Sequence, residues 1–149
     1  SAFWSLDKVG GDEKSYCCFY SNARDFARIG KLYMNNGMWN GTKIVSEEWV
    51  KKSVMAHGLP EDGKVTDQYG YQWWVYDDIF YCRGILGQYI ISIPDEDLVI
   101  VRLGEKRTKS IQLDGKDVSD EQLKKVGHSS DFLKYINFAE QIRKEAEKK

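Results

Sequence analysis

Two short and almost wholly apolar segments constrain the fold of this 149-residue chain more than any other feature. Tyr89–Ile93 and residues 98–103 are separated only by residues 94–97, Pro-Asp-Glu-Asp, which is a typical turn sequence. Strands that are apolar on both faces need cover on both sides. The aromatic-rich segment at residues 69–76 and the segment at residues 79–83 precede them as further extended segments. We therefore predict an α+β fold with a three-stranded antiparallel sheet and flanking helices.

Helices are predicted from capping residues and from apolar residues at helical spacing. The first helix follows Asn22, an N-cap residue whose capping-box partner is Asp25, and Ser46 caps the second. Ser119 caps a short third helix. A long fourth helix follows Ser130 and carries an apolar stripe, which needs the sheet as its packing partner: Phe132, Tyr135, Ile136, Ala139, Ile142 and Ala146.

Composition excludes several classes of function. Basic and acidic residues nearly balance, 22 against 23, so we expect no nucleic-acid partner. No apolar run approaches the roughly 20 residues that span a bilayer, and no signal peptide opens the sequence. The chain does not begin with Met, and we expect that an upstream portion with any targeting signal is missing. The compartment stays open, with an exported or periplasmic location as one alternative.

The cysteine and histidine content argues against a metal site. The three cysteines are Cys17, Cys18 and Cys82, and the only histidines, His57 and His128, lie far apart in the sequence. Zinc sites need more such ligands at fixed spacing, so we expect no metal and no cofactor. Cys17 and Cys18 lie in a short apolar segment, residues 16–20, that we predict to be extended and buried. Three thiols are the simplest interpretation, and a bridge from Cys82 to one of the pair is the alternative.

No complete catalytic motif is present. The spacing of a serine nucleophile and a lysine base occurs once, at Ser5 and Lys8. Both side chains of such a pair must lie on the same face of a helix, so that the lysine amine can take the proton of the serine hydroxyl. Because Gly10 and Gly11 follow almost at once, we predict no helix there and no catalytic role for the pair.

The most informative segment for chemistry is residues 83–88, Arg-Gly-Ile-Leu-Gly-Gln, between two apolar strands. Glycines in a strand interior weaken it unless something must approach the backbone closely. Close approach to a backbone N–H is what an oxyanion hole requires. A glycine-rich bulge without function is the alternative interpretation.

Ordered blocks of sequence lie at residues 22–30, 36–41, 44–50, 69–74, 84–89 and 93–101. Together they resemble the C-terminal half of class C-like serine β-lactamase-family proteins. This family includes esterases, D-alanyl-D-alanine peptidases and 6-aminohexanoate-dimer hydrolases. The resemblance covers roughly residues 3–104 and the final helix, and the ordered blocks are specific for the superfamily. The Arg-Gly-x-x-Gly-Gln form favours the 6-aminohexanoate-dimer hydrolase and esterase branch.

The resemblance implies a β-lactamase/transpeptidase-like fold, in which an antiparallel sheet faces an all-helical lobe across the active site. The family's S-x-x-K and Tyr-x-Asn motifs come before the Asn22 helix, and neither is present here. The letters Tyr20-Ser21-Asn22 match the second motif, but we interpret this as coincidence because Asn22 is a helix cap. We therefore expect residues 1–149 to be a single C-terminal fragment of a β-lactamase-like domain without its catalytic helical lobe.

The resemblance also assigns roles within the glycine-rich segment. The third family motif, Lys-Thr-Gly, aligns with Arg83-Gly84-Ile85. This implies that the backbone N–H of Ile85 is half of an oxyanion hole, whose other half is the nucleophile's own N–H. The substrate-binding residues are expected to be Arg83, Gly84, Leu86, Gly87 and Gln88.

Two functions of different class follow. The first is the C-terminal part of a serine hydrolase that acts by acyl transfer on an amide, ester or β-lactam bond of a small or peptide-like substrate. The second is a non-catalytic binding or structural module derived from the same fold. In either case we expect homo-oligomers of this chain, because its sheet would expose an edge and an apolar face.

Overall fold

The computed structural model describes residues 2–15, 17–58, 60–61, 64–65, 68–104 and 130–148. Helices and antiparallel strands both contribute, so the α+β class predicted from the sequence is confirmed. The short third helix predicted after Ser119 lies outside the described residues. Within those residues, no helix combines the length and the apolar character that a membrane span requires.

Within the described residues, the central sheet has four strands in the order β10-β9-β8-β7, so the prediction of three strands was wrong. The strands are β7 (Trp74–Tyr76), β8 (Ile79–Arg83), β9 (Tyr89–Ile93) and β10 (Leu98–Arg102), and all neighbours are antiparallel. The extra strand is β7, which is shorter than the predicted segment at residues 69–76. The backbone of Gln72 has a positive φ of 70°, which ends the extended conformation before Trp73.

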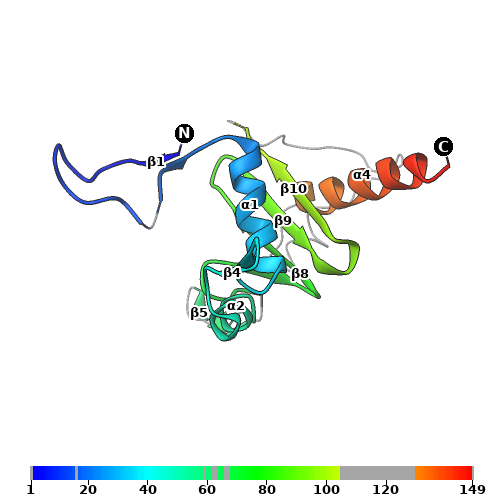
Figure 1. Cartoon of the computed structure of the whole chain (residues 1–149), viewed down its shortest axis with the longest axis horizontal. Coiled ribbons are helices and arrows are strands. Elements are labelled where there is room, and N and C mark those ends of the chain that lie inside the picture. Colours follow the sequence, from blue (N-terminus) through cyan, green and yellow to red (C-terminus); the bar gives the residue numbers. More distant parts are fainter. Residues whose placement is uncertain are drawn as a thin grey trace.

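One face of the sheet packs against α4 (Ser130–Ala146) and forms the main core. Phe132 and Ile136 of α4 are buried against side chains that alternate along the strands: Tyr81, Tyr89, Ile91 and Ile93. The ring of Phe132 stacks on that of Tyr81, with centroids 4.1 Å apart. Only the first half of the predicted stripe is covered, because Ile142 is exposed. The helix projects beyond the sheet towards the C-terminus in Figure 1.

The opposite face of the sheet is covered by α1 (Ala23–Met34), which crosses β9 and β10 in Figure 1. Gly30 is the point of closest approach. A Cβ built there would lie 2.8 Å from Val99 Cγ1 and 3.0 Å from Ser92 Oγ, so a side chain at this position would force the helix away from the sheet. The prediction that the apolar strands are covered on both sides is therefore confirmed.

The N-caps of α1 and α2 agree with the sequence. The Asn22 side chain accepts a hydrogen bond from the Asp25 N–H, 3.0 Å, at the start of α1. Ser46 accepts one from the Trp49 N–H, 3.2 Å, at the start of α2 (Glu47–Ser53). The remaining elements are the hairpins β3 (Met38–Trp39) with β4 (Thr42–Lys43) and β5 (Pro60–Glu61) with β6 (Lys64–Val65), and the 3-10 turn η1 (Pro94–Glu96).

The N-terminal segment forms an arm that extends away from the body of the molecule (Figure 1). Its ends pair as β1 (Phe3–Trp4) and β2 (Phe19–Tyr20). The prediction of a buried segment at residues 16–20 was wrong, because Tyr20 is exposed and Phe19 is half-buried against α1 residue Phe26, with ring centroids 5.5 Å apart.

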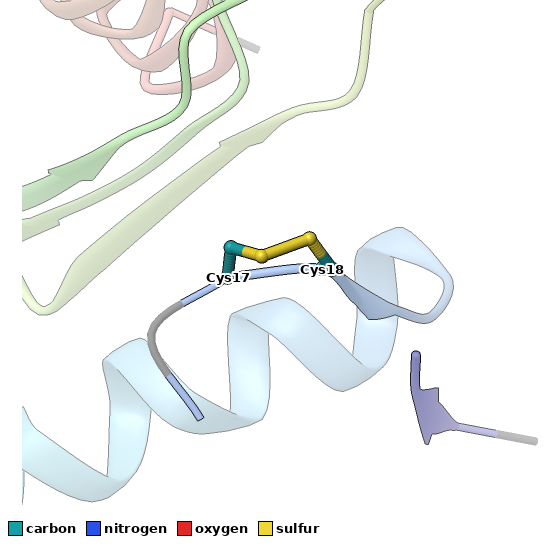
Figure 2. Close-up of a disulfide and its surroundings, with 2 residues drawn as sticks. All are labelled: Cys17 and Cys18. Atoms are coloured by element: carbon teal, nitrogen blue, oxygen red, sulfur yellow. A yellow bond between two sulfur atoms is a disulfide. The ribbon is translucent and has the colours of Figure 1, made fainter. Parts of the chain in front are cut away.

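The two adjacent cysteines of the arm form a disulfide bond with each other. Cys17 and Cys18 are joined as Figure 2 shows, and their Cα atoms are 3.8 Å apart. Cys82 on β8 is a free thiol, and burial raises its pKa to about 12. The simple interpretation of three thiols was wrong, and so was the alternative of a bridge to Cys82, because Cys17 and Cys18 bond to each other and Cys82 stays free.

Candidate functional site

The glycine-rich segment lies between two strands, as predicted, and forms the turn that connects β8 to β9. The turn is closed by backbone hydrogen bonds from Gly84 N–H to the Gln88 carbonyl, 2.8 Å, and from Gly87 N–H to the Gly84 carbonyl, 3.0 Å. Gly87 has φ +83°, a left-handed conformation that glycine adopts without steric cost. The candidate residues from Arg83 to Gln88 therefore lie in one hairpin turn at the end of the sheet.

The tip of this turn presents apolar side chains and one unused backbone donor. Ile85 is 89% exposed and Leu86 is 47% exposed. The Leu86 N–H is bonded to the side chain of Gln88, 3.2 Å. In the part of the chain that the structure describes, the Ile85 N–H has no hydrogen-bond partner. A donor at an exposed turn without an internal acceptor is the kind of group that can bind a ligand oxygen.

The side chain of Gln88 lies against the turn. Its Nε2 donates to the Gly104 carbonyl, 2.9 Å, and its Oε1 accepts from Leu86. A Cβ at Gly84 would overlap Gln88 Oε1. The group that approaches Gly84 closely in this structure is thus the Gln88 amide.

Arg83 ends β8 beside the turn, and its guanidinium lies over the ring of Trp74, 4.3 Å from the centroid. Such a cation–π contact holds the side chain without neutralising its charge. Arg83 makes no ion pair with any residue of the described ranges. Its charge acts on Tyr81, whose pKa is raised by burial while Arg83 opposes the shift. The charge of Arg83 is therefore available to an anionic or polar ligand group at the turn.

The sequence reasoning missed three residues that surround the turn: Trp74, Arg102 and Tyr135. Arg102 ends β10 and pairs in register with Tyr89, the first residue after the turn. Its Nη1 donates to the Gly87 carbonyl, and its guanidinium lies 5.7 Å from the ring centroid of Tyr135. The signal that could have found Arg102 is the antiparallel register between residues 89–93 and 98–102.

Ser5 and Lys8 lie in the extended arm, where the residues are not helical. The Ser5 N–H is bonded to the Cys18 carbonyl, 3.0 Å, and Leu6 forms an isolated bridge with Glu13. The prediction of no helix at this pair is confirmed. Asn22 is the N-cap of α1, as predicted from the sequence.

The described residues contain no cluster of His, Cys, Asp or Glu side chains that could hold a metal ion. His57 stacks on Tyr71, with centroids 4.2 Å apart, and its Nε2 lies 2.5 Å from the Lys52 carbonyl. His57 thus has partners within the protein at the end of α2. His128 lies outside the described residues.

Comparisons with known proteins point to one family. No protein-family model matches the chain. The chain is 35% identical, over 101 residues, to a 6-aminohexanoate-dimer hydrolase of Paenarthrobacter ureafaciens; the match covers 54% of this chain and 23% of that protein. A solved Bacillus anthracis structure, also described as a 6-aminohexanoate-dimer hydrolase, is similar over 96% of this chain and 34% of its own, with 26% identity and a TM-score of 0.66.

The chain therefore spans about a quarter to a third of the length of these relatives. The sequence and the fold of this chain are both similar to the same group of proteins. The resemblance inferred from the sequence is confirmed: the chain is similar to part of a 6-aminohexanoate-dimer hydrolase of the β-lactamase family.

Proposed function

We propose that this chain is the C-terminal part of a serine hydrolase that acts by acyl transfer on an amide, ester or β-lactam bond. In this proposal the nucleophile lies in a helical lobe outside the sequence given. The similarity to two proteins described as 6-aminohexanoate-dimer hydrolases supports a hydrolase. The observation that carries the proposal is the unpartnered N–H of Ile85 at the tip of the β8–β9 turn.

The turn would act at the step in which the substrate carbonyl becomes tetrahedral. As the nucleophile's oxygen attacks, negative charge develops on the carbonyl oxygen, and a preorganised donor about 2.7–3.1 Å away stabilises that charge. The Ile85 N–H would be one such donor, and the nucleophile's own N–H would be the second. Arg83 would attract an anionic or polar part of the substrate, and Leu86 would contact its apolar part.

Burst kinetics test this proposal. The printed chain is expected to release no burst of product from a p-nitrophenyl ester or a chromogenic β-lactam, because nucleophile and base act as a unit and are absent. A longer protein that joins this sequence to its upstream portion is expected to give a burst with at least one of these substrates. A burst from the printed chain, abolished by Ser5→Ala, would contradict the proposal.

The alternative is a non-catalytic binding module of the same fold. It predicts that the longer protein binds a substrate-like amide or ester but gives neither burst nor turnover. The same assay on the longer protein separates the two functions.

A further inference from the structure

The guanidinium of Arg102 holds the β8–β9 turn. Arg102 is the last residue of β10, and its pairing with Tyr89 places it beside the turn. Its Nη1 donates a hydrogen bond to the Gly87 carbonyl. Hydrogen bonds from a charged donor are stronger than those between neutral groups. This contact fixes the peptide plane that follows Gly87.

The side chain of Gln88 makes the second set of contacts that hold the turn. Its amide accepts from the Leu86 N–H and donates to the Gly104 carbonyl, which joins the turn to the segment after β10. The Arg102 guanidinium also packs directly against Gly104, because a Cβ at Gly104 would lie only 2.7 Å from Arg102 Nη1. Arg102, Gln88 and Gly104 therefore form one compact set of contacts, which we call the brace.

The brace reaches the C-terminal helix through Tyr135. The Arg102 guanidinium lies 5.7 Å from the centroid of the Tyr135 ring, and Tyr135 also packs on Tyr89, with centroids 5.7 Å apart. Burial raises the pKa of Tyr135, and the charge of Arg102 opposes this shift. Arg102 therefore lies between the turn and α4 and contacts both.

A turn that contains Gly84 and Gly87 needs such a brace. Glycine loses more conformational freedom on ordering than any other residue. The Ile85 N–H takes part in neither of the two backbone bonds of the turn, and the Leu86 N–H bonds to the side chain of Gln88. An oxyanion donor is effective only when it is already oriented before the reaction.

We propose that Arg102 is a positioning residue, which acts with Gln88 to hold the β8–β9 turn so that the Ile85 N–H is presented to a substrate oxygen. This inference rests on the proposed function and adds to it the residues that preorganise the donor.

Amide exchange by NMR in the printed 149-residue chain tests the physical part of the proposal. Arg102→Met keeps the length of the side chain but removes its donors. We expect the Gly84 and Gly87 amides to exchange about tenfold faster, the factor that corresponds to one hydrogen bond to a charged group. The amides of β9 should be unchanged, and Arg102→Lys should restore part of the protection. The matched control is Arg143→Met, an exposed arginine of α4 that pairs with Glu96 and Glu147.

Two results would overturn the proposal at this stage. The first is unchanged exchange at Gly84 and Gly87. The second is a uniform increase in the turn and in β9, which would make Arg102 a general stabilising residue. If Arg102→Met does not fold, Gln88→Met replaces it as the test of the brace. This variant removes the other half of the brace and leaves β10 intact. It should accelerate amide exchange at Leu86 and nowhere in β9.

Steady-state kinetics of the longer hydrolase test the functional part. Arg102→Met should lower kcat roughly tenfold or more with little change in KM, and Arg102→Lys should recover part of the loss. A higher KM at unchanged kcat, or no change in either, would overturn the positioning role. If the longer protein shows no hydrolysis at all, the proposed function fails, while the exchange data still decide whether the brace holds the turn.

Discussion

Replacing Phe132 by alanine should reduce the free energy of unfolding more than any exposed substitution on α4. The Phe132 ring is fully buried, stacks on Tyr81 at 4.1 Å and meets the edge of Tyr76 at 5.7 Å between centroids. Deletion of a buried phenylalanine ring costs about 3–5 kcal/mol. The loss of two aromatic contacts, each worth about 0.5–1.5 kcal/mol beyond the area buried, favours the upper part of that range.

This loss is large compared with the about 5–15 kcal/mol that stabilises a typical domain. It should lower Tm by roughly 6–20 °C, since each kcal/mol shifts Tm by about 2–4 °C at this chain length. Urea and thermal denaturation followed by circular dichroism provide the measurement. The matched control is Phe138→Ala on the same helix, where the side chain is 61% exposed and the change should stay within about 0.5 kcal/mol. Equal effects of the two variants would refute the docking of α4 described here.

Three further predictions concern the turn and the state of association. In the longer hydrolase, Gly84→Val should reduce turnover by about 10²-fold or more, the scale of losing an oxyanion donor, because the new side chain displaces Gln88; normal turnover in a folded variant would refute the assignment. Arg83→Gln should raise KM for anionic substrates more than for neutral ones, and equal effects would remove its proposed role. The printed chain should form dimers or larger oligomers at micromolar concentration in sedimentation experiments, through the edges β10 or β7 or through the arm; a clean monomer would contradict this prediction.

Local signals in the sequence predicted the helices well. Asn22 and Ser46 are caps because their side chains bond to backbone groups three residues away, and such short-range contacts are visible in the sequence. Short-range signals did not show that the strand predicted at residues 69–76 begins only at Trp74. Gly70 packs against the backbone of Ser53, and the Tyr71 N–H bonds to the Ser53 carbonyl, 2.8 Å, so a contact with α2 bends this segment.

The sequence pattern also did not predict that the N-terminal arm is exposed. An apolar segment at residues 16–20 indicates burial, yet Tyr20 lies on the exposed arm, where it stacks on Phe3 with centroids 5.0 Å apart. The expectation that the sheet exposes an apolar face was wrong, because α4 covers one face and α1 covers the other. The oligomer prediction therefore depends on strand edges and on the aromatic arm rather than on a bare face.

The candidate site was predicted in part. The pair Gly84 and Gly87 marked the turn correctly, because glycines between apolar segments indicate an unusual backbone. The brace was not predicted, since Arg102 meets Gly87 only through the pairing of β9 with β10. A charged residue at a strand end has no distinctive pattern, and its role depends on the register of the sheet.

The most direct test of the oxyanion role is the NMR signal of the Ile85 amide in the longer hydrolase. A boronic acid that adds to the nucleophile places an anionic oxygen where the tetrahedral intermediate would have it. We predict a large downfield shift of the Ile85 amide proton on binding, while the Leu86 amide, already bonded to Gln88, moves little. An Ile85 signal that stays in place while the inhibitor is bound would contradict the proposed role of this turn.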